Sequence, residues 1–217
     1  MRQIEQSDGM HRRGIVLKLL TVLKQICNHP ANYLKNAEMH PELSGKSLML
    51  LQLLETIYDN NEKVIIFSQY QEMGTILKQI IQSHFGKTAL QLHGGNTRNE
   101  RDDMVEDFQN NHLIDTFILS IKAGGTGLNL TAAANVIHYD LWWNPAVEAQ
   151  ATDRAFRIGQ NQNVMVHRMI TKGTLEEKID EMLRSKRDLA NMTIAHGETW
   201  VGELTDKELE DLISFGE

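Results

Sequence analysis

Two arginines three positions apart are the residues of this 217-residue sequence best suited to phosphate chemistry. Arg154 and Arg157 stand in "QATDRAFRIGQ", residues 150–160, and a helix would place both on one face. Their planar, always charged guanidinium groups match the oxygens of a phosphoryl group in transfer. Gln150 and Asp153 would complete a polar face around them. An isolated R-x-x-R is more often a surface salt-bridge patch, so the surrounding sequence must decide.

A glycine-rich stretch, "SIKAGGTGLNLT" at residues 120–131, is the second candidate for contact with an anion. Its glycines are Gly124, Gly125 and Gly127. Such residues let backbone amides approach an anion closely, while Ser120, Thr126 and Asn129 add short polar side chains. The spacing is not that of a dinucleotide fingerprint. A flexible turn is the alternative, but the length of the stretch favours a binding loop.

The triplet Gly45-Lys46-Ser47 matches only the end of the phosphate-binding loop G-x-x-x-x-G-K-[ST]. The first glycine of that loop would fall at position 40, which is His40, and no strand-like run precedes it. The triplet is therefore weak evidence for nucleotide binding. It predicts instead a helix that is capped by Ser44 and carries Lys46 in its exposed first turn.

Apolar runs and helical patterns alternate along most of the chain. Strands are expected at residues 63–68, 88–92, 116–120, 135–140 and 164–170, and helices at 14–28, 44–58, 73–81, 97–108, 145–156 and 174–189 and from 205 onward. This alternation predicts an α/β fold with a parallel sheet and helices on both faces. Polar residues follow several strands, and ligands of such sheets bind at the carboxyl ends of the strands.

Charge and composition are compatible with a phosphate-rich partner. The net charge is −7, but residues 1–46 carry +3 and residues 120–172 carry +2, so a basic face on an acidic body is expected. The longest apolar runs are shorter than a membrane span. The single cysteine, Cys27, cannot form an internal disulfide, and the nine histidines lack zinc-site spacing. A cytoplasmic protein without a membrane or metal partner is expected.

Several of these stretches occur in the order found in a known family. "LKQICNHP", "VIIFSQY", "LHGGNTRNER", the block 120–160 and "VHRMITKGTLEEKI" resemble the second motor lobe of SWI/SNF-type DNA-dependent ATPases of helicase superfamily two, bacterial members above all. The resemblance extends from about Leu17 to Leu189. It implies a RecA-like lobe at residues 46–173, preceded by a helical segment at 1–45 and followed by a bracing helix and an acidic tail at 174–217.

The resemblance also implies roles for individual residues. Arg154 and Arg157 match arginine fingers that reach ATP, whose Mg²⁺ is held by a first lobe, and Gln150, Asp153, Gly127 and Asn129 match positions near the nucleotide. The positions that match contacts to the DNA backbone are Ser68, Gln69, His93, Gly94, Ser120, Gly125 and Thr126. Trp143 and Asn144 match a signature that braces the arginine helix.

The phosphate-binding loop and the acidic magnesium motif of this family belong to its first lobe, and neither is found in this sequence. The chain is therefore predicted to be half of a motor, inactive alone, whose partners are a first lobe and double-stranded DNA, with a nucleoprotein target as a further candidate. The alternative is a catalytically silent RecA-like module for protein interactions. The intact pair of Arg154 and Arg157 favours the motor lobe, since a docking module has no need of it.

Overall fold

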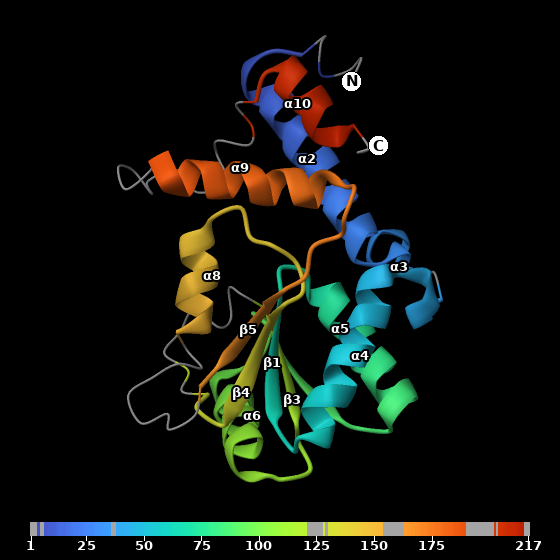
Figure 1. Cartoon of the computed structure of the whole chain (residues 1–217), viewed down its shortest axis with the longest axis vertical. Coiled ribbons are helices and arrows are strands. Elements are labelled where there is room, and N and C mark those ends of the chain that lie inside the picture. Colours follow the sequence, from blue (N-terminus) through green and yellow to red (C-terminus); the bar gives the residue numbers. More distant parts are fainter. Residues whose placement is uncertain are drawn as a thin grey trace.

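The computed structural model describes residues 4, 7–35, 38–120, 128, 130–153, 163–189, 202 and 204–214 (Figure 1). Its centre is a five-stranded parallel sheet with the order β2-β3-β1-β4-β5. The strands are Lys63–Ser68 (β1), Ala89–Leu92 (β2), Thr116–Ser120 (β3), Ala133–His138 (β4) and Met165–Arg168 (β5). All strand pairs are parallel, which confirms the predicted α/β class.

Helices cover both faces of this sheet. Gly45–Asp59 (α4) and Gln71–Phe85 (α5) share one hydrophobic cluster with the sheet, while Arg98–Asn110 (α6) and Pro145–Thr152 (α8) share another with the opposite face. The central strand β1 is apolar on both faces and is fully buried from Val64 to Phe67. Burial on both faces explains why the parallel strands read as continuous apolar runs instead of alternating patterns.

Local capping determines where most helices begin. The Ser44 hydroxyl accepts a hydrogen bond from the first turn of α4, as predicted. Thr97 forms a full capping box with the glutamate three positions later at the start of α6. Thr205 does the same before Asp206–Ile213 (α10). These side chains satisfy amides that have no partner within their own helix.

Thr174 and Glu177 have the spacing of a capping box at the start of the next helix, but they do not form its reciprocal pair of hydrogen bonds. The helix begins at the expected place, as Leu175–Leu189 (α9). However, the Thr174 hydroxyl accepts from the backbone amide of Glu176 at 3.2 Å, and the Glu177 carboxylate accepts from the amide of Gly173 at 2.9 Å. Each bond is displaced by one residue from the reciprocal pattern, so Glu176 is free to point into the protein.

A helical layer lies beyond the carboxyl ends of the strands (Figure 1). It consists of α9, α10 and Gly9–Asn28 (α2), which share a hydrophobic cluster that includes Trp143. Pro30–Leu34 (α3) and the short 3-10 helix Pro41–Leu43 (η1) connect α2 to α4. None of the helices in the described ranges combines the length and apolar composition needed to span a bilayer.

Candidate functional site

Three residues predicted to contact nucleic acid lie together at the carboxyl edge of the sheet. Ser68, His93 and Ser120, from the ends of β1, β2 and β3, line one small cavity of about 10 Å³. The loop after β2 is closed by the Asn96 side chain, which accepts from the His93 amide at 2.9 Å, and Gly94 in this loop is exposed. The fold therefore gathers the polar residues that the sequence placed after separate strands.

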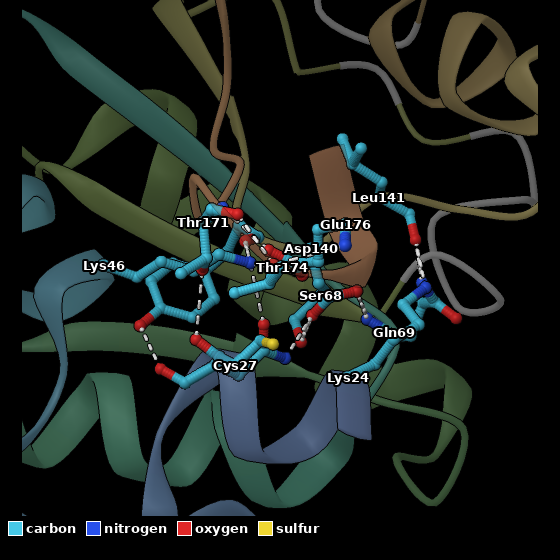
Figure 2. A network of polar contacts seen from close by, with 12 residues as sticks. Lys24, Cys27, Lys46, Ser68, Gln69, Asp140, Leu141, Thr171, Thr174 and Glu176 are labelled. Atoms are coloured by element: carbon cyan, nitrogen blue, oxygen red, sulfur yellow. Dashed lines mark hydrogen bonds and ion pairs between the residues drawn. The ribbon is translucent and has the colours of Figure 1, made fainter. Parts of the chain in front are cut away.

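The loop after β1 is held from inside the protein by Asp140 (Figure 2). The Ser68 hydroxyl donates to Asp140 Oδ2 at 2.6 Å, and the Gln69 amide donates to Oδ1 at 2.9 Å. Asn28, at the end of α2, donates to Oδ2 at 3.1 Å. Asp140 is fully buried and Ser68 is nearly so. The Ser68 side chain thus faces the interior, although the sequence suggested a nucleic-acid contact.

The prediction of an exposed Lys46 is wrong. This side chain is buried and its ammonium donates to Glu176 Oε1 at 2.6 Å, to Asn28 Oδ1 at 3.1 Å and to the carbonyl of Tyr139 at 3.1 Å (Figure 2). The reason is that α4 begins beneath α9, so its first turn is covered by another helix. A buried charge is tolerated where a carboxylate and further acceptors surround it. The lysine of the triplet is therefore a structural lysine.

A second buried lysine, Lys24 of α2, lies in the same region, so that two buried lysines face two buried carboxylates. Its ammonium donates to the carbonyl of Leu141 and lies 4.3 Å from the centre of the Trp143 ring. Burial lowers the pKa of Lys24 to about 8, although the Asp140 carboxylate acts in the opposite direction. Two lysines and two carboxylates, Lys24, Lys46, Asp140 and Glu176, are thus buried together between the sheet and the helical layer.

Two neighbours of this region stay uncharged at neutral pH. Burial lowers the pKa of His138 to about 4, and its Nε2 lies 2.9 Å from the hydroxyl of Thr152. Burial also raises the pKa of Tyr139, whose hydroxyl lies 3.1 Å from Ser47 Oγ and donates to the Asn28 carbonyl at 3.1 Å. Both groups therefore contribute hydrogen bonds and leave the balance of charge unchanged.

Helix α8, which leads toward the predicted arginine fingers, is held at its start and middle. Asn144 caps it by accepting from the Ala146 amide at 2.9 Å. Glu148 accepts from the Trp142 amide at 2.7 Å and from Arg168 of β5 at 3.0 Å. Burial raises the pKa of Glu148, and the Arg168 guanidinium opposes this shift.

The same arginine extends the connection to the helical layer. Arg168 also donates to Asp180 of α9 at 2.6 Å, so one side chain joins β5 to both α8 and α9. A cavity of about 180 Å³ lies beside these groups. Gln150 and Asp153 are exposed near the end of α8. The predicted residues that lie outside the described part of the chain are Arg154, Arg157, Gly125, Thr126, Gly127 and Asn129, and their roles remain predictions.

Comparisons with known proteins identify the family. Residues 45–159 match the helicase conserved C-terminal domain. The ATP-dependent helicase/translocase YwqA of Bacillus subtilis is 53% identical over 210 residues, which are 95% of this chain and 22% of that protein. The SWI2/SNF2 ATPase core of Sulfolobus solfataricus in complex with double-stranded DNA has a TM-score of 0.88 at 41% identity, over 100% of this chain and 45% of that one. The chain belongs to the SWI2/SNF2 family of helicase-like ATPases.

The match to a separately solved domain defines which part of such an ATPase this is. The SWI2/SNF2 ATPase C-terminal domain of the same archaeon has a TM-score of 0.84 at 40% identity, with 100% of this chain and 88% of that chain covered. The chain is thus a C-terminal RecA-like lobe. It spans about a fifth of the length of its relative YwqA. This confirms the predicted fold and family.

The buried charges of this SWI2/SNF2 lobe were not found by sequence reasoning. Asp140 lies at the carboxyl end of an apolar run, where a charged residue next to buried neighbours is a usable signal. Glu176 offered a weaker signal, because an acidic residue in the first turn of a helix is ordinarily a surface residue. Lys24 offered a positional signal, because it stands four residues after Leu20 and eight after Val16, on the buried face of α2.

Proposed function

We propose that this lobe works as the second half of an ATP-driven translocase on double-stranded DNA. In this proposal Arg154 and Arg157 act on the γ-phosphate of ATP, which a first RecA-like lobe holds together with Mg²⁺. The loops after β1, β2 and β3 contact the phosphate backbone of the duplex. The observation that carries the proposal is the match of the whole chain to an ATPase core solved with double-stranded DNA.

The arrangement of the described residues supports this division of work. Ser68, His93 and Ser120 meet at one edge of the sheet, where a backbone could run across the ends of several strands. Gln150 and Asp153 are exposed on a helix that Glu148 and Arg168 fix to the sheet. In the described ranges no three His, Cys, Asp or Glu side chains are grouped as ligands for a metal ion. The assignment of Mg²⁺ to the first lobe comes from the family resemblance alone.

The central test replaces the arginines in a two-lobed protein that contains this lobe. Arg154→Ala or Arg157→Ala should lower ATP turnover by about 10³- to 10⁵-fold, the range of arginine fingers in related phosphoryl transfer, with DNA affinity nearly unchanged. Lysine at either position keeps the charge but loses the planar fork, so it should rescue little. Steady-state ATPase assays and duplex-binding titrations measure the two effects separately.

Lys87→Ala is the matched control, because it removes one cation at the opposite, amino end of the sheet. It should leave turnover within about twofold, as expected of a half-exposed ion pair. Near-parental ATPase with lost DNA affinity in either arginine variant would move these residues from the nucleotide to the nucleic acid. Parental values for both activities would show that neither arginine serves the nucleotide or the DNA, and an unmodified two-lobed protein without DNA-stimulated turnover would favour the alternative, a silent protein-interaction module.

A second test uses the 217-residue chain alone. It should bind duplex DNA weakly, with an affinity that falls steeply as salt rises and varies little with base sequence, because backbone contacts release counterions. It should also hydrolyse ATP no faster than buffer does. Robust DNA-stimulated hydrolysis by the purified chain, or a strong base-sequence preference in competition assays, would contradict the proposal.

A further inference from the structure

Asp140 lies within the block 120–160 but has no role assigned to it in the proposed function, yet it contacts the loop after β1. Its carboxylate accepts from three donors: the Ser68 hydroxyl, the Gln69 amide and the Asn28 side chain. It is fully buried, so no part of it reaches a ligand directly. Any effect of Asp140 on function must therefore pass through the residues that it holds.

The bonds made by Ser68 show how the loop is fixed. Its hydroxyl has a single hydrogen, which it donates to Asp140, and its oxygen accepts from the amide of Tyr70 at 3.2 Å. Asp140 thus controls the backbone of the turn at Gln69 directly and at Tyr70 through Ser68. The Gln69 side chain donates to the carbonyl of Leu141, which adds a third bond between the same two loops.

Asp140 is also connected to the helical layer, through Asn28 at the end of α2. Asn28 donates to Asp140 with its nitrogen and accepts from Lys46 with its oxygen, and Lys46 in turn pairs with Glu176 of α9. Figure 2 shows Asp140, Lys46 and Glu176, three of these groups, in the interior. A continuous set of buried polar contacts therefore runs from the loop after β1 to α9. Satisfied buried networks of this kind fix one arrangement of the elements that they join.

We propose that Asp140 is a positioning residue, which sets the loop after β1 for contact with the DNA backbone and aligns that loop with α9 through Asn28, Lys46 and Glu176. The inference rests on the proposed function, since it concerns the same nucleic-acid edge. Ser68 contributes to this edge as a holder of the loop, and the amides of Gln69 and Tyr70 are taken up by Asp140 and Ser68, so Asp140 acts on the edge through the shape of the loop.

Asp140→Asn tests the proposal with a nearly isosteric change. Asparagine has one acceptor oxygen and an NH₂ group, so one of the three donors would meet another donor. In the 217-residue chain, hydrogen exchange at the amides of Gln69 and Tyr70 should become about tenfold faster, because their bonds depend on this carboxylate. Asp115→Asn is the matched control: the same change at the amino end of the sheet should leave both amides unaffected.

The functional readout uses the two-lobed protein. In Asp140→Asn, the DNA concentration that gives half-maximal stimulation of the ATPase should rise about tenfold, while turnover at saturating DNA changes much less. General destabilisation would lower turnover at all DNA concentrations instead. Unchanged exchange at Gln69 and Tyr70 in a folded variant overturns the proposal, and so does faster exchange without a shift in the DNA dependence.

A second variant covers the case in which Asp140→Asn fails to fold. Ser68→Ala removes two hydrogen bonds, the one to Asp140 and the one from the Tyr70 amide, while Asp140 keeps Gln69 and Asn28 as donors, so exchange should become faster at Tyr70 and less so at Gln69. Parental exchange in Ser68→Ala would overturn the proposal. If the unmodified two-lobed protein shows no DNA stimulation at all, the proposed function fails, while the exchange data still decide whether Asp140 fixes the loop.

Discussion

Two lysine–carboxylate pairs lie at opposite ends of the sheet and differ in their exposure to water. Lys46 and Glu176 approach to 2.6 Å at the carboxyl end, where their side chains are 3% and 1% exposed. Lys87 and Asp115 approach to 2.5 Å at the amino end, where the values are 40% and 18%. The distances are alike, so distance alone does not say what each pair contributes. Burial decides whether loss of one partner leaves a charge that water can solvate.

The surroundings of the two pairs differ in the same way. Lys46 also donates to Asn28 and Tyr139, so its ammonium is satisfied by protein alone. Lys87 has the Tyr58 ring 4.8 Å from its ammonium and otherwise faces solvent. The carboxyl end therefore holds a network that joins α2, α4, β4 and α9. The pair at the amino end joins the approaches to β2 and β3, with the Tyr58 ring of α4 beside it.

The largest effect is expected when the buried pair is broken from one side. Lys46→Met should lower the free energy of unfolding by about 3–5 kcal/mol, because Glu176 would keep an uncompensated charge in the interior. Chemical denaturation of the 217-residue chain, followed by circular dichroism, measures this change. The double variant Lys46→Met with Glu176→Gln should recover part of the loss, since no buried charge is then left unpaired. A single variant as stable as the parent would show that the pair is not the main support of this end.

The contrast between the two ends explains what the sequence could and could not predict. The strands and most helix starts were predictable, because apolar runs and caps such as Ser44 depend on neighbours close in sequence. The burial of Lys46 was not, because Glu176 lies 130 positions further along the chain. Local patterns place a lysine in a first turn at the surface, and only the tertiary packing of α9 reverses that.

The candidate site shows the same division. Motif order placed Ser68, His93 and Ser120 after separate strands, and the rule for parallel sheets correctly brought them to one edge. The strand pattern could not predict that the Ser68 side chain points into the protein. That direction depends on a hydrogen bond to Asp140, which follows a different strand. Sequence therefore gave the location of the polar loops, and tertiary structure was needed to say which side chains hold the loops in place.

A smaller effect is expected at Lys24, where the comparison can be sharpened by pH. Burial lowers the pKa of Lys24 from 10.5 to about 8, so between these values the unfolded chain binds a proton that the folded chain has released. Stability should therefore rise with pH above 8, by at most about 1.4 kcal/mol per pH unit from this group. Lys24→Met should remove that rise, which denaturation at several pH values between 7.5 and 9.5 would measure.

The upper limit of this pH range comes from the tyrosines. Burial raises the pKa of Tyr58 to about 12 and raises that of Tyr139 as well, so above pH 10 the unfolded chain loses protons first and stability falls. Burial also lowers the pKa of Lys63 and raises that of Cys27, and both residues are present in the parent and in the variant. The difference between the two proteins therefore isolates Lys24. An identical slope in Lys24→Met would contradict the assignment.

The smallest effect is expected at the amino end. Lys87→Met should lower the free energy of unfolding by only about 0–1 kcal/mol, because the remaining Asp115 carboxylate can be hydrated. The loss should shrink further as salt rises from about 0.05 M to about 0.5 M, because the screening length becomes about threefold shorter. The loss in Lys46→Met should hardly change over the same range, since buried pairs are screened much less. Parallel denaturation of both variants across this salt range measures the difference. A loss of several kcal/mol in Lys87→Met would mean that the half-exposed pair supports the sheet as strongly as the buried one, and burial would then no longer explain how the two ends differ.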